Sequence, residues 1–168
     1  MERIADKVLD ALEAYYARPV KRRDSPWVFL REVQIGTGRR GRRGRQPKHV
    51  KQRMDAWAYN TWPSMREAVA YEVKTNRQDF TNELQKPEKR QAALLLSSRF
   101  YFITTPGVVA DVTEIPEECG WILLQENGEM VGMKEAPLRE LGSFPDYFVN
   151  SLIRRIARRE KEEESNES

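Results

Sequence analysis

The sequence predicts a mixed α/β domain with a mixed central sheet, and three observations support this prediction. Short apolar segments follow one another over residues 27–74, as in a sheet. Amphipathic segments with helical periodicity lie near both ends of the chain. Asn127-Gly128 separates two further apolar runs, which indicates a hairpin. The length of 168 residues fits one domain, which we place at residues 1–160.

The first half of the chain predicts one helix followed by three strands. Residues 4–16 carry Ile4, Val8, Leu12 and Tyr15 on one helical stripe, with acidic residues opposite. Residues 27–35, 53–59 and 69–74 read as strands. Because the links around residues 60–68 are short, consecutive strands are expected to form an antiparallel meander.

The second half predicts a helix, a strand, a hairpin and a last helix. Pro87 suits the first turn of a helix, which the segment EKRQAALLLSS continues. RFYFIT predicts a buried strand, and the Asn127-Gly128 hairpin follows. The last helix begins near Pro145, and the acidic residues 161–168 predict a disordered tail. The expected order is therefore α-β-β-β-α-β, followed by an extra hairpin and a C-terminal helix.

The composition excludes several classes of protein. No apolar run approaches the length of a membrane span, and the first helix does not resemble a signal peptide. Cys119 and His49 are the only cysteine and histidine, which excludes an intrachain disulfide and a Cys/His zinc site. We therefore expect a cytoplasmic protein with no membrane partner.

A basic segment over residues 36–53 contains no acidic residue. Such a loop is typical of a phosphate contact, and DNA is the expected partner. A solvated loop or a basic address signal is the alternative interpretation. The candidate DNA-binding residues are Arg39, Arg40, Arg42, Arg43, Arg45, Lys48, Lys51 and Arg53.

The same segment contains a G-x-G-x-x-G pattern at residues 36–41. A dinucleotide site would also require a helix directly after the glycines. The following residues, Arg42 to Pro47, begin a helix poorly. The sequence therefore does not predict a Rossmann domain.

Two acidic residues and a lysine at the ends of neighbouring strands suggest hydrolytic chemistry. Glu72 and Lys74 lie two positions apart and so share one face of a strand. Asp55, on the preceding strand, can be their cross-strand neighbour. Mg²⁺ binds one or two carboxylates together with water and substrate phosphate, and the Val73 carbonyl could supply a further oxygen. A structural ion pair is the commoner explanation of such a triplet taken alone.

The linked motifs extend this pattern over most of the chain. RMDAWAY is followed by AVAYEVKTNRQDF, then by a Pro-containing helix, RFYF and EIPEECGWILLQENG. Together they resemble the PD-(D/E)XK nuclease superfamily, in particular its small, DNA-repair-associated (MmcB-like) bacterial and phage branch. The resemblance covers about residues 27–138 and implies a restriction-endonuclease-like core.

The resemblance implies a Mg²⁺- or Mn²⁺-dependent deoxyribonuclease that acts in DNA repair, recombination or phage DNA metabolism. Asp55 and Glu72 correspond to the metal-binding acids and Lys74 to the catalytic lysine. Glu32 corresponds to an acid on the preceding strand and is a candidate further ligand; Glu13, on the first helix, is the alternative. A non-catalytic nucleic-acid-binding module that retains the fold is the competing interpretation.

Overall fold

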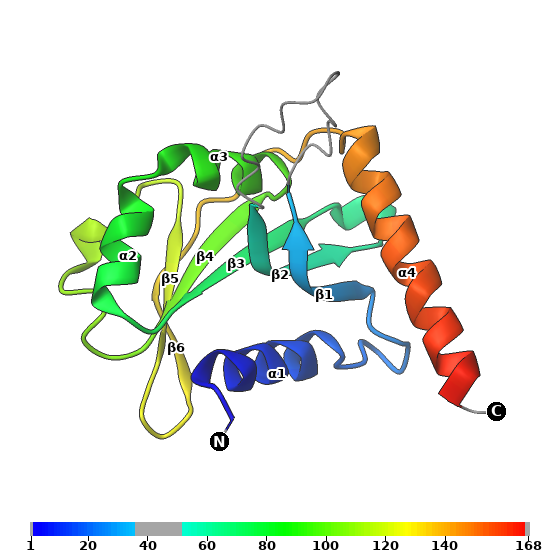
Figure 1. The fold of residues 1–168 in the computed structure, drawn as a ribbon, viewed down its shortest axis with the longest axis horizontal. Helices are drawn as coiled ribbons and strands as arrows, with labels where there is room; N and C mark the ends of the chain where they lie inside the picture. Colours follow the sequence, from blue (N-terminus) through cyan, green and yellow to red (C-terminus); the bar gives the residue numbers. More distant parts are fainter. Residues whose placement is uncertain (1, 36–51, 167–168) are drawn as a thin grey trace, which may run out of the picture.

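The computed structural model describes residues 2–35 and 52–166, which form an α/β domain (Figure 1). A six-stranded sheet has the order β1-β2-β3-β4-β5-β6. Its strands are β1 (Trp27–Gln34), β2 (Arg53–Asn60), β3 (Ala68–Lys74), β4 (Arg99–Thr104), β5 (Gly120–Leu124) and β6 (Met130–Lys134). The helices are α1 (Ile4–Tyr16), α2 (Arg77–Leu84), α3 (Pro87–Leu95) and α4 (Asp146–Asn166), with short 3₁₀ turns at Pro63–Met65 and Val112–Glu114.

The sheet is mixed, as the sequence predicts. β1, β2 and β3 pair antiparallel, so the predicted meander is confirmed. β4 pairs parallel to β3, and α2 and α3 make the crossover that a parallel pair requires. β5 pairs parallel to β4 and antiparallel to β6 across the predicted hairpin turn. Gly128 has φ +85° in this turn, a conformation that a side chain would strain.

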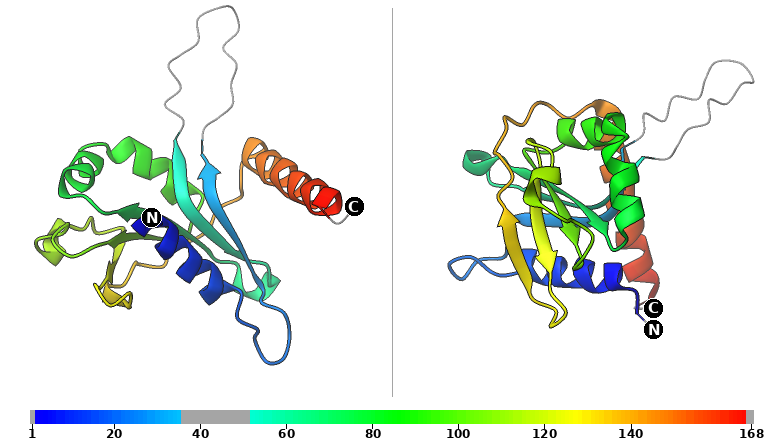
Figure 2. Two further views of the ribbon diagram at one scale, coloured as in Figure 1. Left: turned by 60° about the horizontal axis from the view of Figure 1, so that its bottom comes forward. Right: turned by 90° about the vertical axis from the view of Figure 1, so that its left-hand side faces the viewer.

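Helices cover the two faces of the sheet, with α1 on one side and α2 and α3 on the other (Figures 1 and 2). Side chains alternate along β3, so Val69 and Tyr71 pack with α1 while Ala68 and Ala70 face the opposite core. The α1 core also contains Val8, Leu9, Leu12, Tyr16, Ala56, Ala58 and Ile103. The larger core on the other face includes Trp57, Phe80, Leu94, Leu96, Phe100, Phe102 and Phe148.

Two segments differ from the prediction. The sequence predicts one helix from Pro87, whereas the structure adds α2 before it. Asn76 begins α2 because its side chain accepts hydrogen bonds from the backbone N–H groups of Gln78 and Asp79, at 2.8 and 3.2 Å. The sequence also predicts disorder from residue 161, whereas α4 continues to Asn166.

α4 lies beside the edge strand β1 (Figure 1). Phe148, which is fully buried, packs edge-on against Trp57 with their ring centroids 5.4 Å apart. Farther along the helix, Arg155 donates a hydrogen bond to the backbone oxygen of Glu32. No helix within residues 2–35 and 52–166 is both long and apolar enough to cross a membrane.

Candidate active site at the ends of β2 and β3

An irregularity in the β1–β2 pair sets the position of Asp55. Arg31 pairs with Ala56 and Val33 with Met54, but Glu32, with φ +52°, interrupts the pairing between them. Leu30 and Val33 lie in the same core although they are three residues apart, and so do Met54 and Trp57. Regular strands would place residues three apart on opposite faces. Both strands therefore change face at this point, which is where Asp55 lies.

Asp55 connects β2 to β3 beyond their last paired residues. The ladder ends at Ala56 and Tyr71, and the Asp55 Oδ2 atom then accepts a hydrogen bond of 2.8 Å from the Val73 N–H. Burial raises the pKa of the Asp55 carboxyl, and the Val73 N–H and Lys74 offset part of this rise. The carboxylate is thus fixed by the backbone at the point where the two strands part.

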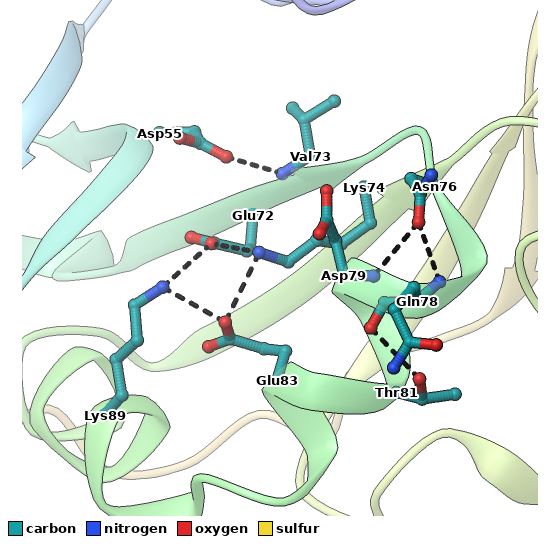
Figure 3. Close-up of polar contacts among 10 residues, drawn as sticks. All are labelled: Asp55, Glu72, Val73, Lys74, Asn76, Gln78, Asp79, Thr81, Glu83 and Lys89. Carbon is teal, nitrogen blue, oxygen red and sulfur yellow. Dashed lines mark hydrogen bonds and ion pairs between the residues drawn. The ribbon is translucent and has the colours of Figure 1, made fainter.

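Glu72 and Lys74 project together from the end of β3 toward α2 and α3 (Figure 3). Glu72 is only 6% exposed, and its Oε1 atom lies 2.8 Å from the Lys74 Nζ atom. The sequence predicts that these side chains share a face, and the structure places them so. The two side chains are shielded from solvent because they lie on the side of the sheet that α2 and α3 cover. In addition, β3 lies inside the sheet, between β2 and β4.

Two residues that the sequence analysis did not identify complete the cluster. The Glu83 Oε2 atom, on α2, lies 3.3 Å from Lys74 Nζ and 3.1 Å from Lys89 Nζ. Lys89, in the first turn of α3, also lies 3.2 Å from Glu72 Oε1. Figure 3 shows the resulting network, in which each lysine contacts both glutamates. We call Glu72, Lys74, Glu83 and Lys89 the four-charge network.

The electrostatics of the site follow from burial and from close charges. Burial raises the pKa of Glu72, and the nearby Asp55 raises it further, while Lys74 and Lys89 oppose the rise. Burial lowers the pKa of each lysine, but the glutamates outweigh it and leave both lysine pKa values raised. With Asp55 included, the cluster holds three acids and two lysines.

The structure does not bring the other candidate acids into this cluster. The Glu32 side chain is 57% exposed and pairs with Arg53, with Nη1 and Oε1 3.5 Å apart. Glu13 pairs with Arg31 on the α1 side of the sheet, next to Asp10. Glu83 is the acid that joins Glu72 instead. Its signal in the sequence was Asn76-x-x-Asp79, a helix start that places Phe80 and Glu83 on one buried side.

Most of the predicted DNA-binding residues lie outside the described part of the chain, at residues 36–51. Arg53 is described, and its side chain is exposed beside Glu32. The base of the segment is also described: the Ile35 N–H donates to the Gln52 oxygen at 2.9 Å. The segment therefore departs from and returns to the sheet close to Asp55.

The residues present fit a hard divalent cation through two carboxylates. Within residues 2–35 and 52–166, no group of three or more His, Cys, Asp or Glu side chains is arranged to hold a metal. Asp55 and Glu72 are close enough for the charge of one to raise the pKa of the other. Two carboxylates suffice for Mg²⁺, which keeps several water ligands.

Comparison with known proteins identifies a shared fold. Neither family models nor curated protein sequences match this chain. A solved structure, that of a protein of unknown function from Silicibacter pomeroyi, is similar with a TM-score of 0.58 and 20% sequence identity. The similarity covers 99% of this chain and 92% of that one, so it extends over the whole fold.

Proposed function

We propose that this chain is a Mg²⁺- or Mn²⁺-dependent deoxyribonuclease with the restriction-endonuclease-like core of the PD-(D/E)XK superfamily. The observation that carries the proposal is the convergence of Asp55, Glu72 and Lys74 where β2 and β3 part. The antiparallel meander followed by a helical crossover to a parallel strand agrees with such a core. DNA repair, recombination or phage DNA metabolism is the proposed setting.

Asp55 and Glu72 would hold the cation, and the Val73 carbonyl remains a candidate oxygen ligand. When bound, a hard cation neutralises charge on the reacting phosphate and promotes ionisation of a water molecule. Asp55 is suited to this role because the Val73 N–H orients its carboxylate. Glu72 is suited to it because a cation would relieve the charge repulsion between these two acids.

Lys74 would act on the scissile phosphate or on the attacking water. Its ammonium group is held within the site by Glu72 and Glu83, so its position is set before substrate arrives. A cation there favours an approaching phosphodiester and a developing negative charge. The basic segment at residues 36–53 would bind the DNA backbone beside this site.

The non-catalytic alternative also has a specific observation in its favour. Both lysines of the four-charge network are paired with glutamates, and no three-acid metal group exists among the described residues. A fold that had lost catalysis could keep these ion pairs for structure and bind DNA through its basic segment alone. Metal-dependent cleavage separates the two functions.

The test is cleavage by the purified protein in Mg²⁺, Mn²⁺ or EDTA. Linear, circular, single-stranded and forked DNA should be compared. We expect cation-dependent cleavage by the wild type. Loss of an outer-shell group near a metal costs about 10–100-fold, so Asp55→Asn and Glu72→Gln should each lose at least about 100-fold of the rate.

Glu88→Gln is the matched control, since Glu88 is exposed on α3 and makes no ion pair with a described residue. This variant should cleave like the wild type. Thermal melts should show that all three variants are folded. Near-normal turnover by folded Asp55→Asn or Glu72→Gln would remove the assignment of the active site.

A further inference from the structure

Lys89 occupies a position that the proposed chemistry does not require. One lysine, Lys74, already lies on β3 beside Glu72, yet α3 brings a second ammonium group to the same glutamate. Lys74 and Lys89 approach the same oxygen, Oε1 of Glu72, at 2.8 and 3.2 Å. This oxygen belongs to one of the two acids that would hold a cation.

Two ammonium groups on one carboxylate oppose the binding of a further cation there. Like charges repel strongly at the short separations of a partly dry site. Glu72 is buried, so solvent screens this repulsion less than at the surface. For a divalent cation to bind Glu72, at least one ammonium group must therefore move away or weaken its contact.

Glu83 provides a place for the displaced ammonium groups. Its Oε2 atom already contacts both lysines, at 3.3 Å from Lys74 and 3.1 Å from Lys89. Glu83 is buried, so leaving its charge unpaired would be costly.

We propose that the Lys89 ammonium group competes with a divalent cation for the Glu72 carboxylate, and that Glu83 retains Lys74 and Lys89 when the cation binds Glu72. Glu83 and Lys89 are positioning residues in this scheme: they set the affinity for the cation and keep Lys74 at the site. The inference rests on the proposed function, since it concerns the cation that function requires.

The test measures cation binding without DNA, by calorimetric titration of the whole chain with Mn²⁺. Lys89→Met removes the charge and keeps an unbranched apolar side chain. We expect the Kd for Mn²⁺ to fall about tenfold, the effect of removing one close like charge. Glu83→Gln should raise the Kd by a similar factor, because the lysines then have only Glu72 as a partner.

Three further variants make the result specific. Lys89→Gln repeats the charge removal with a polar side chain, in case Lys89→Met does not fold. Lys89→Arg keeps the charge and should bind Mn²⁺ more weakly than the charge-removed variants do. Lys86→Met removes an exposed lysine that makes no ion pair with a described residue, and it should change the Kd little.

Each outcome decides the inference. The inference is supported if Lys89→Met or Lys89→Gln binds Mn²⁺ more tightly than the wild type while Lys86→Met does not. It is also supported if Mn²⁺ binding is detected only in Lys89→Met or Lys89→Gln. An unchanged or raised Kd in the folded charge-removed variants overturns it, as does absence of Mn²⁺ binding in every variant. The cleavage assay is read separately: metal-dependent cleavage with an unaltered Kd would leave the proposed function standing and the role of Lys89 refuted.

Discussion

Glu72 and Glu83 are the only buried acids among the described residues, and both belong to the four-charge network. Burying charges is unfavourable even when they are paired, and an apolar replacement of similar volume is often as stable. Stability alone therefore gives no reason to keep four charges between a sheet and two helices. The same contacts do place two acids and two lysines beside Asp55, as proposed for catalysis.

The pKa of Asp55 leads to a prediction about stability and pH. Burial raises this pKa above the ordinary value of 3.8, so the folded chain holds the proton to higher pH than the unfolded chain. The contribution of Asp55 to the free energy of unfolding should consequently fall as pH rises from about 3.8 through the raised value. Asp55→Asn removes this contribution and should gain stability relative to the wild type over that window.

Urea unfolding of the wild type and Asp55→Asn between pH 2.5 and 7 measures the effect. Asp111→Asn is a control of opposite sign, because hydrogen bonds from Thr113 lower the pKa of Asp111. That contribution is present at higher pH and lost on acidification, so Asp111→Asn should lose stability relative to the wild type as pH rises. Parallel curves for the wild type and Asp55→Asn would contradict the assignment of a raised pKa to Asp55.

At the scale of elements, the pairing of β4 with β5 depends on close packing at Gly120. Gly120 lies opposite Tyr101 in the parallel pair. A Cβ atom at Gly120 would come within 2.4 Å of the Tyr101 ring and 2.6 Å of the Ala136 backbone nitrogen. The Tyr101 ring in turn stacks on Tyr71 of β3, so the contact extends across three strands.

Gly120→Ala should therefore destabilise the protein by about 1–3 kcal/mol, the usual cost of overpacking a core. Gly132→Ala is the matched control within β6, because a Cβ atom there meets nothing within 4 Å. It should be neutral or stabilising by up to about 1 kcal/mol, since alanine restricts the unfolded chain. Denaturant unfolding measures both, and equal effects would show that Gly120 tolerates a side chain.

At the scale of the whole molecule, the described residues at the two ends of the basic segment lie close to the candidate site. Ile35 and Gln52 are hydrogen-bonded at the base of this segment, and Asp55 follows three residues later. Arg53 lies between them and is exposed. DNA bound by residues 36–53 would therefore be held near Asp55, Glu72 and Lys74.

Salt dependence tests the contact with the DNA backbone. Arg39, Arg40, Arg42, Arg43 and Arg45 should be replaced together by Ser. If they contact phosphates, duplex affinity should fall for every sequence, and log K against log salt should flatten by roughly 0.9 for each lost contact. Sequence preference should not change, because phosphate contacts carry no base information. Unaltered affinity and slope would refute the contact and leave the active-site proposal untouched.

The sequence determined most of the elements, because their signals are local. The stripe of α1, the alternation of β3 and the Asn127-Gly128 turn each depend on residues close together in the chain. It also indicated that Glu72 and Lys74 share a face, since a strand has a period of two. The start of α2 had a local signal as well, in Asn76 and Asp79.

Only the tertiary structure decided which charges meet. Glu83 and Lys89 come from two helices, and each reaches Glu72 or Lys74 through packing on the sheet. Glu32 and Asp55 both lie between the pairs Arg31–Ala56 and Val33–Met54. The Glu32 side chain nevertheless stays exposed, with a positive φ and an ion pair to Arg53. Such outcomes depend on side-chain directions at irregular points of a sheet and on the crossing of helices over it. Neither leaves a periodic pattern in the sequence, because the contacts join residues whose spacing along the chain is arbitrary.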